Sequence, residues 1–117
     1  MKLGSYILLF LLPLVTFGKE TVYTVTAYCN CPACTGYYSG GPTASGAMPR
    51  QGITIAAPRS IPFGTVLEIE GLGRRVVQDR LASSHDNRID IFLRSHAAAR
   101  RFGIKKLKVT DIASEKQ

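Results

Sequence analysis

The sequence predicts an all-β domain: a small six-stranded barrel with one short helix. Short stretches of alternating or β-branched residues recur along the chain, and turns rich in glycine and proline separate them. One late stretch of strong helix formers interrupts this pattern. The 117 residues, 45% apolar and 20% charged, suit a single folded domain and exclude a disordered charged tail.

The first 18 residues have the features of a secretory signal peptide. Lys2 supplies the positive charge, and residues 6–17 form an apolar stretch that Pro13 interrupts. A membrane-spanning helix needs about 20 apolar residues, so this stretch is too short. We expect cleavage after Gly18, which leaves residues 19–117 as one exported domain. An uncleaved membrane anchor is the alternative.

The strands are predicted by alternation and by β-branched content. The most regular case lies at residues 65–70, where Leu67 and Ile69 face one way and Glu68 faces the other. The same criteria give strands at residues 21–28, 53–57, 65–70, 74–79, 88–93 and 106–112. Residues 29–48, rich in Gly, Pro, Ser and Thr, are expected to form a long loop.

The helix is predicted between two boundary residues. Ser95 is a typical N-cap, and Gly103 is a typical stop. Between them, Ala98 and Phe102 are expected to face the core, while the two arginines at 100 and 101 face solvent.

Three cysteines follow the first strand as Cys29-x-Cys31-x-x-Cys34. One interpretation is a zinc site completed by His85 or His96, although zinc ligand pairs usually have two to four residues between them. Because an exported chain tends to oxidise, we expect instead a disulfide between two of the cysteines, one free thiol and no metal. The pairing stays open, since sequence alone does not fix connectivity.

Two aspartates, Asp79 and Asp90, are candidate catalytic residues. Asp90 lies on the opposite face of its strand from the flanking isoleucines, so it can line a groove beside Phe92. A partly desolvated carboxyl there would have a raised pKa and could act as a general acid. The neighbouring Arg80 and Arg88 would lower that pKa, and plain ion pairs at the strand edges are the alternative.

Further polar residues surround these features. The loop Thr43 to Gly46 is small enough to let a ligand approach, although an ordinary surface loop shows the same composition. His85 lies in a polar loop as a turn or site residue, and His96 is expected to be a solvated first-turn residue. The candidate substrate-binding residues are Tyr28, Thr43, Ser45, Arg80, His85, Arg88 and Phe92.

The formal charge of +7 comes from basic residues spread over several predicted elements. In an exported chain, such charge suits an anionic cell envelope better than nucleic acid. A solubilising surface is the alternative.

Taken together, TVTAYCNCPAC, PTASG, GITIAAPRSIPFGT, VVQD, RIDIFLRSH and AARRFG, in this order, resemble the 3D domain family of bacterial cell-wall proteins. That family is named for three aspartates. It is related to the C-terminal domain of membrane-bound lytic transglycosylase A and, more distantly, to rare lipoprotein A. The resemblance runs from about Thr21 to Val109 and implies a double-psi β-barrel.

The resemblance also assigns roles to the aspartates. The general acid/base of the family maps to Asp90, and its second aspartate, eleven positions earlier, maps to Asp79. The first family aspartate is replaced here by Ala57, and the usually glycine-rich stretch after the second reads RLASSHD. The chain therefore holds two of the three aspartates.

What the resemblance implies is action on peptidoglycan glycan strands, by lytic transglycosylase cleavage of the bond between N-acetylmuramic acid and N-acetylglucosamine. A non-catalytic wall-binding module is the alternative, and a zinc-dependent or redox module built on the cysteines is a third hypothesis. We expect a monomer in the periplasm, cell envelope or medium, with no cofactor, no nucleic acid partner and no membrane anchor after signal cleavage.

Overall fold

The computed structural model describes residues 19–82 and 86–112, so the predicted signal peptide and His85 lie outside the described residues. Each predicted strand and the late helix are confirmed, with every boundary within one residue of the prediction. The strands are β1 (Glu20–Tyr28), β2 (Thr54–Ala57), β3 (Val66–Ile69), β4 (Gly73–Arg80), β5 (Arg88–Phe92) and β6 (Lys105–Asp111). The helices are α2 (Pro32–Thr35), the 3-10 turn η2 (Gly36–Tyr38) and α3 (His96–Phe102).

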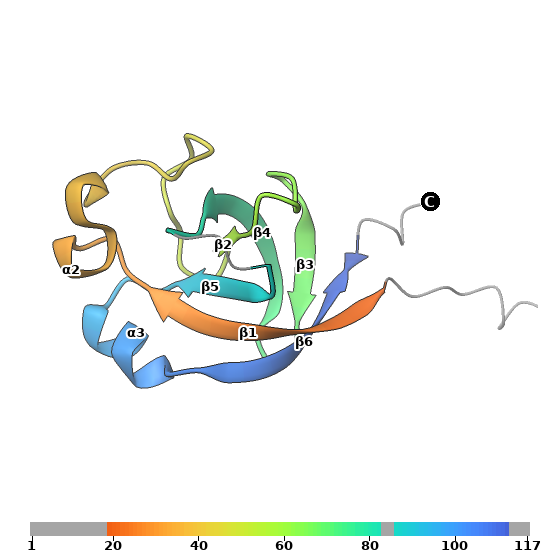
Figure 1. The fold of residues 1–117 in the computed structure, drawn as a ribbon. Helices are drawn as coiled ribbons and strands as arrows, with labels where there is room; N and C mark the ends of the chain where they lie inside the picture. The colour runs from red at the N-terminus through yellow and green to blue at the C-terminus, as the bar shows by residue number, and fades with distance from the viewer. Residues whose placement is uncertain (1–18, 83–85, 113–117) are drawn as a thin grey trace, which may run out of the picture.

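The six strands form a closed barrel in the order β1-β5-β2-β4-β3-β6, and β6 pairs with β1 to close it (Figure 1). Two neighbouring pairs, β1–β5 and β2–β4, are parallel, and the other four are antiparallel. Every strand therefore has a partner on both sides, and the barrel has no open edge.

The core lies inside this barrel. It consists of apolar residues that alternate along the strands with residues facing outward. In β3, Leu67 and Ile69 are buried while Glu68 is exposed, as the alternation predicts. The buried core cluster is Val25, Ile55, Ala57, Leu67, Ile69, Val77, Ile89, Ile91 and Val109. Side chains at the intervening positions point to the outer face of the barrel.

Helix α3 forms as predicted, between its capping serine and glycine. The Ser95 side chain accepts a hydrogen bond from the Ala98 backbone N–H over 3.1 Å, and Gly103 follows the last turn with φ of 73°. Ala98, predicted to face the core, is only half-buried, and Ala99 is the buried residue of the helix. Ala99 is buried and Phe102, three residues later on the same face of the helix, packs against the core cluster.

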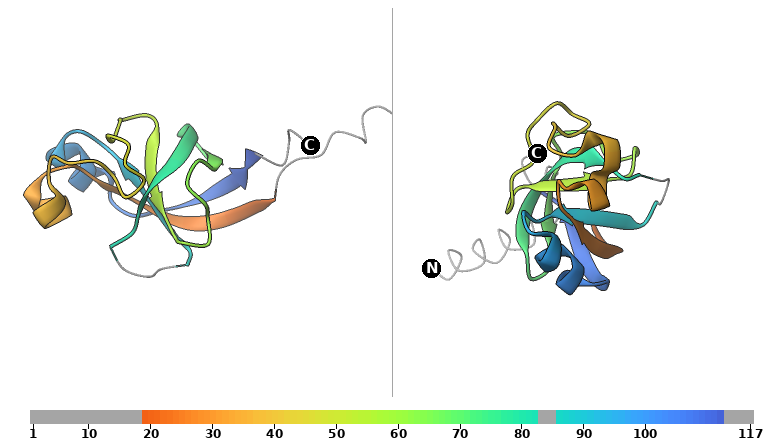
Figure 2. Two further views of the ribbon diagram at one scale, coloured as in Figure 1. Left: turned by 90° about the horizontal axis from the view of Figure 1, so that it is seen from above. Right: turned by 90° about the vertical axis from the view of Figure 1, so that its left-hand side faces the viewer.

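The prediction of one long loop over residues 29–48 was also wrong in part. Pro32 occupies the first turn of α2, where its missing N–H has no partner to lose, and Gly36 ends this turn with φ of 57°. Helices α2 and α3 lie at the same end of the barrel, opposite the end at which β1 begins (Figures 1 and 2). This end therefore gathers segments far apart in the sequence.

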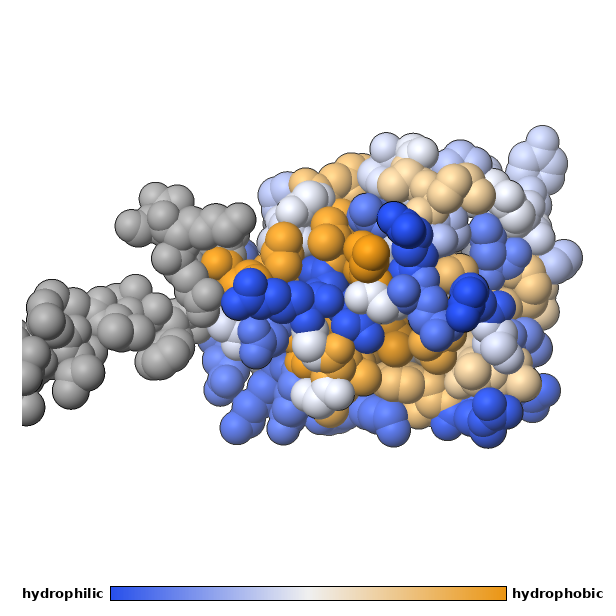
Figure 3. Space-filling model, turned by 180° about the vertical axis from the view of Figure 1, so that it is seen from behind, coloured by the Kyte–Doolittle hydropathy of each residue, from blue (hydrophilic) through white to orange (hydrophobic). Residues whose placement is uncertain are grey.

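The outer surface of the barrel carries both hydrophilic and apolar residues. On the face shown in Figure 3, strongly hydrophilic residues lie directly beside apolar ones. The described ranges contain no helix with the length and hydropathy that crossing a membrane requires.

Candidate functional site

The register of the barrel brings the two candidate aspartates to either side of one small residue. Ala56 of β2 lies opposite Asp79 of β4 and opposite Asp90 of β5. A register shift in the β2–β4 pairing passes over Gln78, which puts Asp79 rather than Gln78 beside Ala56. Lateral neighbours in a sheet point to the same face, so both carboxylates lie on one strip of the outer face.

Asp90 is held by a cation and a hydroxyl. Arg88 Nε lies 3.0 Å from Asp90 Oδ1, and the Thr26 hydroxyl donates to the same oxygen. Arg88 Nε also donates to Thr26 Oγ1 over 3.2 Å, so the three side chains form a closed triangle. The alternative interpretation, that Asp90 forms an ion pair, is therefore confirmed in part, since Asp90 pairs with Arg88.

The second oxygen of Asp90 is different. Among the described residues, both side chains that donate to Asp90 do so at Oδ1. Within the same residues, no buried side-chain oxygen lacks a hydrogen-bond partner. The Asp90 side chain is 18% exposed, so part of it is in contact with solvent.

Asp79, by contrast, accepts three hydrogen bonds. The Tyr28 hydroxyl donates to Oδ2 over 2.8 Å, while the backbone N–H groups of Ala44 and Arg80 donate to Oδ1 over 3.0 and 2.9 Å. These donors belong to β1, the loop after η2 and β4 itself. Asp79 therefore fixes three segments relative to one another.

Tyr28 donates a hydrogen bond to Asp79 and lies close enough to Asp90 to be affected by its charge. Burial, the charge of Asp79 together with its hydrogen bond, and the charge of Asp90 all raise the pKa of Tyr28 above its ordinary value. Its ring also packs edge-on against Phe92, with 5.5 Å between the ring centroids. Tyr28 and Phe92 are partners in the parallel β1–β5 register, so they extend the same outer strip.

The loop from Thr43 to Ala47 is folded against this strip. Thr43 is buried, and its hydroxyl donates to the Ala47 carbonyl over 2.8 Å and lies 3.1 Å from Ser45 Oγ. The Ser45 backbone N–H donates to the Gln78 carbonyl over 3.1 Å. The loop is thus a defined structure beside Asp79, with the Ser45 side chain exposed.

One predicted site residue points elsewhere. The Arg80 guanidinium lies over the Phe63 ring, with 4.0 Å from Cζ to the centroid, and donates to the carbonyls of Ala57 and Pro58. Only its backbone N–H reaches Asp79. Conversely, the sequence analysis missed Thr26, although Thr26 shares the alternation of β1 with Tyr28 and could have been placed on the same face.

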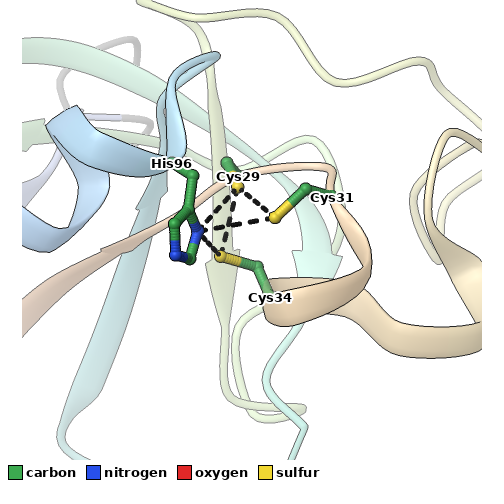
Figure 4. A group of neighbouring side chains, drawn as sticks. All are labelled: Cys29, Cys31, Cys34 and His96. Atoms are coloured by element: carbon green, nitrogen blue, oxygen red, sulfur yellow. Dashed lines mark hydrogen bonds between the residues drawn. The ribbon is translucent and has the colours of Figure 1, made fainter.

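A second cluster lies at the end of the barrel that carries α2 and α3. The three cysteines meet His96, the first residue of α3 (Figure 4). Cys29 Sγ lies 2.9 Å from Cys31 Sγ and 3.2 Å from Cys34 Sγ. His96 Nδ1 lies 3.5, 3.4 and 3.5 Å from the sulfurs of Cys29, Cys31 and Cys34. Four ligand-type atoms therefore converge on one point.

The electrostatics within the cluster are asymmetric. Burial raises the pKa of the Cys29 thiol, which is only 1% exposed. The hydrogen bond from Cys29 lowers the pKa of Cys31 to about 7, and the backbone of Cys34 and Ala33 acts in the same direction. Cys31 is therefore the thiol of the pair that carries negative charge most readily.

The expected disulfide is not present in this structure, in which all three cysteines are free. His96 also differs from its expected role. It is exposed, as a solvated first-turn residue would be, but its Nδ1 faces the three sulfurs. Of the two histidines proposed as a fourth zinc ligand, His96 lies beside the cysteines, and His85 is outside the described residues.

Comparison with known proteins shows that the chain is similar in sequence to two cell-wall proteins. No protein-family profile matches the sequence. Over 93 residues, 79% of this chain, it is 29% identical to YabE of Bacillus subtilis (strain 168), which is named for cell wall shaping. Over 96 residues it is 33% identical to the cell wall-binding protein YocH of the same organism. The matched region spans 23% of the length of YabE and 32% of the length of YocH, so this chain is similar to a part of each cell-wall protein.

Proposed function

We propose that this chain is an exported cell-wall protein that acts on peptidoglycan glycan strands as a lytic transglycosylase. The similarity to a wall-shaping and a wall-binding protein supports the cell-wall assignment and the exported location. The closed six-stranded order with two parallel pairs agrees with the double-psi barrel that the resemblance to the 3D domain family implies. The basic surface suits an anionic envelope polymer.

The observation that carries the catalytic part of the proposal is the difference between the two oxygens of Asp90. Oδ1 is fixed by Arg88 and Thr26, whereas no donor to Oδ2 comes from the part of the chain that the structure describes, and the side chain is 18% exposed. A carboxyl held by one oxygen and free at the other is oriented for proton transfer to a bound ligand. Geometry of this kind supports Asp90 as the acid/base.

The reaction itself needs one carboxyl. Asp90 protonates the glycosidic oxygen that leaves as O4 of N-acetylglucosamine, and its carboxylate takes the proton of the muramic acid 6-hydroxyl. That 6-oxygen forms a new bond to C1 of its own sugar as the glycosidic bond breaks, which gives a 1,6-anhydro product. The proton has moved from the attacking to the leaving oxygen, and Asp90 returns to its initial state. Hydrolytic glycosidases need a second carboxylate because their nucleophile is not tethered in this way.

Asp79 then acts as a positioning residue. Its oxygens are occupied by Tyr28 and by two backbone N–H groups, which leaves it poorly placed for proton transfer. Through these bonds it holds the Tyr28 hydroxyl and the Ala44 backbone in place.

A specific observation also favours a second candidate, a wall-binding module without catalysis. Ala57, which stands where the family has its first aspartate, is fully buried in the core cluster. The carboxylate that other members carry there is therefore replaced by an apolar contact. The name of YocH, a cell wall-binding protein, points in the same direction.

Digestion of purified sacculi distinguishes the two candidates. Residues 19–117, which contain the whole barrel and its core, are incubated with sacculi, and the soluble products are identified by mass spectrometry. Soluble 1,6-anhydro-muropeptides support the transglycosylase. Reducing-end products would mean that water is the nucleophile, and protein that pellets with the sacculi without releasing product would support the binding module.

A further inference from the structure

The cluster of Cys29, Cys31, Cys34 and His96 takes no part in the proposed cleavage, and its geometry points to a different role. We propose that these four residues form a structural Zn²⁺ site that fastens α2 and α3 to the end of β1. The proposal rests on the side-chain positions alone and does not depend on what the barrel binds or cleaves.

His96 is the most informative member. It comes from a different element and lies 62 to 67 residues along the chain from the cysteines. Its Nδ1 is nearly equidistant from the three sulfurs, at 3.4 to 3.5 Å. A disulfide would use two sulfurs and would not involve the histidine. A tetrahedral metal site, in contrast, needs a fourth ligand at this place.

The distances fit a zinc ion. With Zn–S of about 2.3 Å and Zn–N of about 2.0–2.1 Å, a tetrahedral site separates nitrogen from sulfur by about 3.5–3.6 Å and sulfur from sulfur by about 3.8 Å. The three N–S separations agree with this value. The two S–S separations, 2.9 and 3.2 Å, are shorter, so the metal would spread the sulfurs by less than about 1 Å.

The ligand set and the local backbone favour zinc as the occupant. Three thiolates and one imidazole form a Cys₃His set, which is a common structural zinc site. Soft sulfur ligands disfavour magnesium and calcium. Cys31 and Cys34 have the two-residue spacing of zinc ligand pairs, and the N–H of Cys34 donates to the Cys31 carbonyl over 3.0 Å to form the tight turn between them.

Because four protein ligands fill a tetrahedral shell, the site would be structural and not catalytic. It lies next to the candidate active site, since Cys29 follows Tyr28 directly. A metal here would fix the end of β1 that presents Tyr28 to Asp79. A metal here would also explain why a four-residue helix forms in a segment with no buried residue in its own turn.

The test measures metal and thiols on protein made from the full chain. Zinc content is determined by elemental mass spectrometry, and thiols are counted in the denatured protein before and after reduction. We expect about one zinc per chain and three free thiols without reduction. Replacement of Zn²⁺ by Co²⁺ should give the visible absorption of tetrahedral cobalt with a thiolate charge-transfer band. This readout on the wild type does not depend on any variant folding.

Variants identify the ligands. His96→Gln should lose most of the zinc, and His96→Cys should restore it because Cys₄ sets also bind zinc. His85→Gln is the matched control, since it removes the other candidate histidine and should leave the zinc content unchanged. Two thiols that appear only after reduction, with no metal bound, would overturn the proposal in favour of a disulfide. Three free thiols with no zinc and no cobalt spectrum would overturn it as well.

Discussion

Tyr28 donates a hydrogen bond from its hydroxyl to Asp79 Oδ2 over 2.8 Å, and this contact joins β1 to β4 across the strands between them. The two residues are 51 positions apart in the sequence. The hydroxyl is held in place by the packing of its ring against Phe92. The candidate site is thus built on a polar contact between strands that do not pair with each other.

The first prediction concerns this contact. Tyr28→Phe keeps the ring but removes the donor to a carboxylate, which should cost about 1–3 kcal/mol in the free energy of unfolding. Urea unfolding followed by fluorescence or circular dichroism measures it. Tyr38→Phe is the control, because Tyr38 is 74% exposed and should change stability by less than about 0.5 kcal/mol. Equal effects of the two variants would show that the bond to Asp79 contributes nothing.

The second prediction concerns the titration of Tyr28. Because burial and the two aspartates raise its pKa, the folded chain keeps this proton where the unfolded chain, with a pKa of about 10, loses it. The resulting stabilisation is fully present below pH ~10 and is lost as the pH rises through the folded pKa. An ultraviolet titration should therefore show a late tyrosine component that shrinks in Tyr28→Phe. A wild-type curve with every tyrosine ionising near pH ~10 would contradict the assignment.

The third prediction concerns the core. Ile89 is fully buried in the barrel, so Ile89→Ala should destabilise the protein by about 2–5 kcal/mol in equilibrium unfolding. Ile104, which is 76% exposed between α3 and β6, provides the matched control. Ile104→Ala should change the free energy of unfolding by less than about 0.5 kcal/mol. A small cost at Ile89 would mean that the alternation of β5 does not place this face in the core.

Much of this fold could be predicted from the sequence, because the information is local. The alternation in residues 65–70 gives β3, and Ser95 with Gly103 gives α3. Which side of α3 faces the core was harder to predict. Ala98 and Ala99 are chemically identical, and only the docking of the helix on the barrel decides which one is buried.

The candidate site depends on information that is not local. Asp79 and Asp90 lie on either side of Ala56 only because β2 pairs with both β4 and β5 and because the register shifts at Gln78. Neither fact leaves a periodic signal in the sequence. The same holds for His96, which meets the cysteines through the docking of α3 on β1. Thr26 is the exception, since its alternation with Tyr28 was visible.

The fourth prediction concerns Thr26. Its hydroxyl donates to Asp90 and accepts from Arg88, so Thr26→Val should leave the carboxylate less well oriented. We expect a loss of about tenfold or more in the rate of anhydro-muropeptide release, with the amount of protein bound to sacculi unchanged. Thr24→Val, two residues earlier on the same strand and the same face, is the control. A parallel loss of sacculus binding would show instead that Thr26 contacts the glycan.

The central claim is that Asp90 moves the proton in glycan cleavage, and the most direct test is the release of 1,6-anhydro-muropeptides from sacculi by Asp90→Asn. The amide keeps the shape of the side chain but removes its acid/base function, so the rate should fall by about 100-fold or more while sacculus binding persists. Glu68→Gln, the same chemical change at an exposed position of β3, should release product at the wild-type rate. Wild-type release from a folded Asp90→Asn protein would contradict the claim.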